Sequence, residues 1–189
     1  MNFSKKNLTE KEQKEWERKL IGYVLAVNIF DQTLIHIAIP QLKAKLKDDS
    51  TKIKVIISCC DSITAYCKSI HGILEKAYND VRDHQVLEFD SDLPFPPSPP
   101  KPPSSGSDDK IMWFQLAWDI IRPIINLIAK ASSEIRVLVV PLETAVDKLL
   151  SDLAKYFKPP IKAIKLELVN VENLPINEFP KIDSIVIPV

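Results

Sequence analysis

Residues 9–39 read TEKEQKEWERKLIGYVLAVNIFDQTLIHIAI, and this stretch decides the fold. Its large apolar residues recur in alternating steps of four and three, the period of one face of an α-helix. Thr9 and Glu12 have the spacing of a capping box, so the helix should begin here. Pro40 should kink or stop it, because proline lacks the N–H that a helix interior needs. The apolar stripe consists of Trp16, Leu20, Tyr23, Val27, Phe30, Leu34 and Ile37.

A second apolar stripe with the same spacing follows a short turn. Asp48, Asp49 and Ser50 supply the turn and an N-cap for the next helix. Two long helices joined in this way predict an antiparallel, coiled-coil-like hairpin that occupies residues 1–87. The second stripe consists of Ile53, Ile56, Cys60, Ile63, Cys67, Ile70, Leu74, Ala77 and Val81.

A proline-rich run separates this hairpin from the rest of the chain. Residues 94–103 read PFPPSPPKPP. Proline cannot donate a backbone hydrogen bond, and such runs favour the extended polyproline II conformation. We therefore interpret residues 88–109 as an exposed linker loop.

Helical spacing returns over residues 110–158, which should pack on the hairpin. Pro123 lies inside this segment and predicts a kink. The segment is either one bent helix or two helices, and we favour two with a break within residues 131–141. Ser132 could cap the second of them, and Pro141 suits a first helical turn.

Residues 159–189 form a tail of different character. Ile164, Leu166 and Leu168 alternate with charged residues, and residues 184–189 are a second β-branched run, so short strands are expected. The predicted fold class is mainly α: an antiparallel bundle of about four long helices with a small β-containing C-terminal tail.

The composition excludes several functional classes. Lys+Arg and Asp+Glu both number 25, so the chain lacks the basic excess of a nucleic-acid-binding protein. It has neither a phosphate-binding glycine loop nor a nucleophile elbow. Cys67 and His71 could make half a metal site, but a packed thiol beside a surface histidine is the simpler interpretation. We predict no enzyme activity, no cofactor and no metal.

The N-terminus and the cysteines favour a cytoplasmic protein. The first residues are charged and lack the apolar core of a signal peptide. All three cysteines lie in one helical segment at spacings that suit no disulfide, which favours reduced thiols.

Three sets of residues are candidates for contact with a partner. Pro96, Pro99 and Lys101 match a short PxxPxK pattern that SH3-type grooves bind, although a simple spacer would look the same. The apolar C-terminal residues Ile187 and Val189 could add a strand to a partner's sheet. A basic cluster around the first turn could meet anionic lipid or an acidic partner; it consists of Lys43, Lys45, Lys47, Lys52 and Lys54.

We therefore expect a non-enzymatic protein-binding or assembly component that presents helical faces and a C-terminal strand to a protein partner or to copies of itself. The alternative is a membrane-active, toxin-like helical protein, pore-forming or membrane-remodelling. Residues 20–39 and 111–129 approach the length of a bilayer crossing. Both contain charged residues, such as Asp31 and Asp119, which are costly inside a membrane. Membrane association is thus possible but not favoured.

Overall fold

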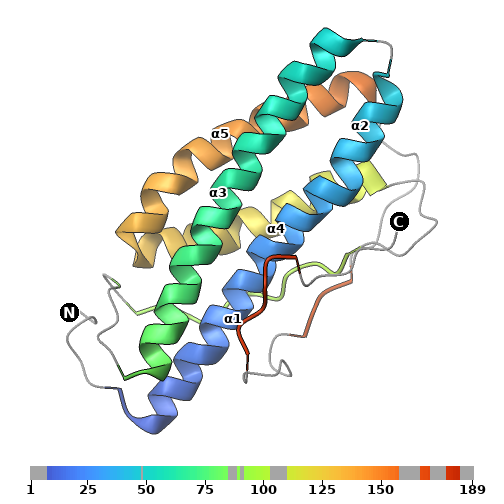
Figure 1. Cartoon of the computed structure of the whole chain (residues 1–189). Coiled ribbons are helices and arrows are strands. Elements are labelled where there is room, and N and C mark those ends of the chain that lie inside the picture. Colours follow the sequence, from blue (N-terminus) through green and yellow to red (C-terminus); the bar gives the residue numbers. More distant parts are fainter. Residues whose placement is uncertain are drawn as a thin grey trace.

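The computed structural model describes residues 8–47, 49–84, 89, 92–102, 110–157, 167–170 and 178–183. This part of the chain is mainly α-helical, with four long helices (Figure 1). The first is continuous and comprises α1 (Glu10–Thr33), a π-helical turn η2 (Leu34–Ala38) and α2 (Ile39–Lys45). The others are α3 (Ser50–Arg82), α4 (Lys110–Ala131) and α5 (Ser133–Tyr156).

The helices begin where local capping chemistry predicts. Thr9 and Glu12 form the expected capping box, with both side chain to backbone hydrogen bonds at 3.2 Å. The carboxylate of Asp49 accepts from the N–H of Lys52 at 3.0 Å and starts α3. The hydroxyl of Ser132 accepts from the N–H of Ile135 at 3.3 Å, so Ser132 separates α4 from α5. Two helices with a break within residues 131–141 are therefore confirmed.

Of the two effects expected at Pro40, a kink or a stop, the stop does not occur, because the helix continues to Lys45. The π-helical turn η2 lies immediately before the proline, and the N–H of Ile39 donates to the carbonyl of Leu34. In a regular α-helix the proline ring would press against the backbone of the preceding turn. The π-helical turn is wider, so it changes the position of that backbone relative to the ring.

Pro141 was expected in a first helical turn but lies inside α5, and Pro123 lies inside α4. Each proline leaves the carbonyl four residues earlier without its helical donor. Those carbonyls belong to Asp119 and Val137, whose side chains are exposed, so water can reach them.

The four helices form a bundle in which each contacts two neighbours, in the cyclic order α1, α3, α5, α4 (Figure 1). Neighbouring helices run antiparallel, and α1 and α3 pack against each other as a hairpin; its coiled-coil character stays a prediction. The two apolar stripes lie in one continuous core, except that Ile53 is only partly buried against it and Ile37 is buried outside it. The ring of Phe30 packs against Phe114 at 5.2 Å and against Trp118 at 4.9 Å, which joins α1 to α4.

The described part of the proline-rich segment, residues 92–102 and here called the strap, is only partly exposed: Pro94, Phe95, Pro97 and Lys101 are exposed, whereas other residues pack on the helices. Leu93 is fully buried, and Pro96, Pro99 and Pro100 are buried too. The hydroxyl of Tyr23 donates to the carbonyl of Pro94 at 2.8 Å.

The topology explains why part of the strap packs on the helices. The end of α3 lies beside the start of α1, where the side chain of Gln13 donates to the carbonyl of Val81 at 2.9 Å. The start of α4 lies beside α1 and η2 instead, toward the other end of the bundle. The connection must therefore return along the helices. An extended chain covers about 3 Å per residue and has the length to do so while packing on α1 (Figure 1).

The tail shows no strand within the described residues. Its described part makes one isolated antiparallel bridge with the strap, between Leu168 and Pro100. The N–H of Lys101 donates to the carbonyl of Glu167 at 2.7 Å, and that of Val169 to Pro99 at 2.8 Å. Most of the two expected strands, residues 164–168 and 184–189, falls outside the described residues.

Candidate functional site

The strap does not present its proline pattern to solvent. A Cβ atom on Gly22 would lie 2.5 Å from the Cγ of Pro96, so this proline packs directly on the backbone of α1. Lys101 is exposed, with its ammonium 3.9 Å from the carboxylate of Glu167. This placement argues against an SH3-type ligand at Pro96 and Pro99. The C-terminal candidates Ile187 and Val189 lie outside the described residues.

The basic cluster of the first turn is exposed as a whole. Lys52 lies 3.4 Å from Asp49, whose pKa is lowered chiefly by the hydrogen bond from the backbone of Lys52. Lys54 stands at the edge of a groove between α3 and α5. The exposed members are Lys43, Lys45, Lys47, Lys52 and Lys54.

Polar residues in the middle of α1 are buried. The amide oxygen of Asn28 accepts from the Nδ1 of His71 at 2.9 Å, and its amide nitrogen donates to the carbonyl of Lys181 at 3.2 Å. His71 is therefore not the surface histidine that was expected beside Cys67, and burial lowers its pKa. The ring of Phe179 packs on His71 at 5.4 Å. Through these contacts the described part of the tail packs on the hairpin of α1 and α3.

Asp31 is fully buried, and burial raises the pKa of its carboxyl. One oxygen accepts from the side chain of Gln32 at 3.0 Å, whereas the other has no hydrogen-bond partner among the described residues. No group of three or more His, Cys, Asp or Glu side chains that could hold a metal occurs in the described part of the chain.

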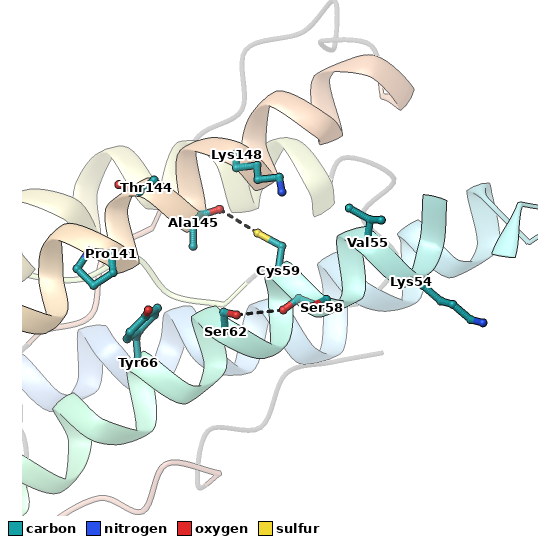
Figure 2. A pocket seen from close by; sticks show the side chains of 10 residues that line it. All are labelled: Lys54, Val55, Ser58, Cys59, Ser62, Tyr66, Pro141, Thr144, Ala145 and Lys148. Atoms are coloured by element: carbon teal, nitrogen blue, oxygen red, sulfur yellow. Dashed lines mark hydrogen bonds between the residues drawn. The ribbon is translucent and has the colours of Figure 1, made fainter. Parts of the chain in front are cut away.

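A groove of about 650 Å³ lies between α3 and α5 (Figure 2). The two helices are antiparallel here, and small side chains on both keep the groove open. Its walls are Lys54, Val55, Ser58, Cys59, Ser62 and Tyr66 of α3, and Pro141, Thr144, Ala145 and Lys148 of α5.

The polar groups of the groove bond to nearby backbone. The hydroxyl of Ser62 donates to the carbonyl of Ser58 at 3.2 Å, and that of Thr144 to Val140 at 3.0 Å. The thiol of Cys59 donates to the carbonyl of Ala145 at 3.3 Å (Figure 2). Burial raises the pKa of this thiol, so it stays protonated and is a poor nucleophile at neutral pH. The groove suits a packing contact better than catalysis.

Exposed apolar side chains occur on both helices that form the groove. Val55 of α3, which lines the groove, is 53% exposed. Val137 and Val140 lie on α5 outside the lining residues and are 73% and 68% exposed. Lys54 and Lys148 stand among the lining residues. Sequence reasoning missed this surface because it followed the large apolar residues that form the core. The available signal was a row of small, uncharged residues on the opposite side of α3.

Comparison of the chain with protein-family models, with curated proteins and with solved structures found no match.

Proposed function

We propose that this protein is a non-enzymatic binding or assembly component whose partner packs into the groove between α3 and α5. The observation that carries the proposal is the groove itself, with Val55 exposed among its lining residues and two more valines, Val137 and Val140, exposed on α5. Packing an apolar side chain of this size against a partner contributes about 1.5–3 kcal/mol when burial is complete. Helical grooves with apolar edges commonly accept a helix of the partner.

The test compares capture of partners by a groove variant and a control variant. Val55→Asp combined with Thr144→Asp places two carboxylates among the lining residues of the groove, whereas Ala44→Asp changes an exposed position on α2. We expect the groove variant to lose proteins that the unaltered chain and the α2 variant both retain. The same set of captured proteins for all three chains would contradict a role for this groove.

A membrane-active protein is the second candidate. Two helical spans have the length and hydropathy to cross a bilayer: the continuous helix Glu10–Lys45 and the span Ile111–Ala131 of α4. The first is 83% buried over its apolar window, as in a core helix, whereas the second is only 50% buried. Insertion would carry Asn28 and Asp31 into the hydrocarbon, at a cost of several kcal/mol.

Flotation with vesicles of neutral and of anionic lipid separates the two candidates. A membrane-active protein floats with the vesicles and releases an enclosed dye. If the chain stays with the soluble fraction at every lipid composition, the membrane candidate is dismissed and the groove proposal stands unaffected.

A further inference from the structure

The outer face of α3 carries an uncharged stripe beside the groove. Its members recur in steps of three and four, and all of them are exposed. Alanine, serine and glycine dominate, so another helix could approach α3 closely along this line. A Cβ atom on Gly72 would meet nothing within 4 Å, which shows how open the stripe is. The stripe consists of Val55, Ser58, Ser62, Ala65, Ser69 and Gly72.

Charged residues accompany this stripe with alternating sign. Lys54, Asp61, Lys68 and Glu75 are spaced by seven residues, so they form one exposed row along α3. Three of them directly precede the stripe residues Val55, Ser62 and Ser69. Only Glu75 has a described ion pair, at 3.3 Å from the imidazole of His71.

The row runs plus, minus, plus, minus from the start of α3. In the reverse direction it runs minus, plus, minus, plus, so two antiparallel copies match each other. In a pair of antiparallel helices with heptad spacing, a residue that flanks the contact line of one helix lies opposite a residue at the same heptad position of the other helix. Lys54 then faces Glu75 of the second copy, and Asp61 faces Lys68, with each pair occurring twice.

The uncharged stripe fits the same register. The layers are Ser62 against Ala65 at the centre, Ser58 against Ser69, and Val55 against Gly72, so the largest residue meets the smallest. A parallel pair lacks this complementarity. In a parallel pair, the charged row of one copy would lie opposite Cys59, Tyr66 and Ile73 of the other copy. These three residues are partly buried and uncharged.

From this charge pattern we infer that the partner at the α3–α5 face is a second copy of the chain, with the two α3 helices packed antiparallel about a two-fold axis near residues 63 and 64. The inference rests on the proposed function and names its partner. The stripe from Val55 to Gly72 is about 26 Å long at the helical rise. One helix pair of that length buries less than the roughly 800 Å² per partner of a standard interface. The α5 wall of the groove, which includes Thr144 and Lys148, supplies the rest of the contact.

Reciprocal charge reversal tests this register. Asp61→Lys places two lysines opposite each other twice in a pair of identical variants, and Lys68→Asp does the same with two carboxylates. Each variant alone should self-associate on the order of tenfold more weakly than the unaltered chain at low salt. An equimolar mixture of the two should regain the original affinity, because every facing pair between a D61K copy and a K68D copy again joins opposite charges.

Sedimentation of the full chain over a range of concentrations measures these affinities. Lys11→Asp changes an exposed charge on α1 and should leave self-association unchanged. Lys68 lies near buried Asp31, so circular dichroism must show that Lys68→Asp folds. If it does not, Lys54→Glu with and without Glu75→Lys replaces it, and the double variant should restore what the single one loses.

A chain that remains monomeric at all concentrations would overturn the inference, and so would charge variants that associate as well as the unaltered chain. Failure to recover affinity in the mixture would overturn the antiparallel register. None of these results depends on capture of other proteins by the groove variants, so the inference and the proposed function can fail separately.

Discussion

Gly22 offers a direct test of how the strap is held. A Cβ atom at this position would lie 2.5 Å from the Cγ of Pro96 and 3.4 Å from its Cδ. Gly22→Ala therefore forces the strap away from α1, and overpacking of this kind costs about 1–3 kcal/mol. Alanine also stabilises a helix interior by about 1 kcal/mol relative to glycine. The free energy of unfolding should thus fall by up to about 2 kcal/mol.

Gly72 is the matched control, because it also lies inside a long helix but a Cβ atom added to it would have nothing within 4 Å. Gly72→Ala should raise the free energy of unfolding by up to about 1 kcal/mol. The two substitutions should differ by about 1–3 kcal/mol in urea denaturation at low protein concentration.

A double-mutant cycle identifies the contact responsible. Pro96→Ala removes the ring atoms that meet the new methyl group, so Gly22→Ala should be neutral or stabilising in that background. If Gly22→Ala stabilises the otherwise unaltered chain as much as Gly72→Ala does, Pro96 does not pack on α1 and the account of the strap is refuted.

Three further predictions concern buried polar groups. Tyr23→Phe leaves the carbonyl of Pro94 without its donor and should lower the free energy of unfolding by about 1 kcal/mol, with no loss of helical circular dichroism. Burial raises the pKa of Asp31, so its ionisation costs stability as the pH rises from about 4 through that raised value. In thermal denaturation, Asp31→Asn should stabilise the fold more at pH 7 than at pH 4. An equal effect at both pH values would contradict the burial of an ionised carboxylate at Asp31. Burial lowers the pKa of His71, so the stability it contributes is complete above about pH 6.5 and is lost as the pH falls. His71→Gln should weaken this loss between pH 7.5 and pH 5, and unchanged pH dependence would show that His71 does not titrate as described.

Local signals predicted most of the helices. The capping box at Thr9 and the N-caps at Asp49 and Ser132 depend on residues three positions apart, so sequence spacing contains the information. The predictions made from the positions of the prolines were less successful. Pro40 and Pro141 are accommodated by a π-helical turn and by solvent exposure, and neither feature is visible in the spacing of apolar residues.

The candidate site was harder to predict, because it depends on which helices become neighbours. Val55 and Thr144 lie far apart in the sequence, and only the packing of α3 on α5 places both in one groove. The apolar stripe of α3 was interpreted correctly as core, and the uncharged stripe on its other side was overlooked. Pro96 and Pro99 were interpreted as accessible to a partner. The composition of a segment indicates how polar it is, but it does not indicate which of its residues are buried.

The amino-acid sequence by itself determined where the helices begin and which faces of α1 and α3 are apolar, since both depend on residues within a few positions of each other. Tertiary structure decided that Leu93, Pro96 and Pro99 of the proline-rich segment are buried, that Asp31 lies in the core and that α3 and α5 leave a groove between them. The physical reason is that burial depends on distant segments covering one another. Here the direction of four antiparallel helices required the connection to return along α1, where Gly22 and Tyr23 receive it.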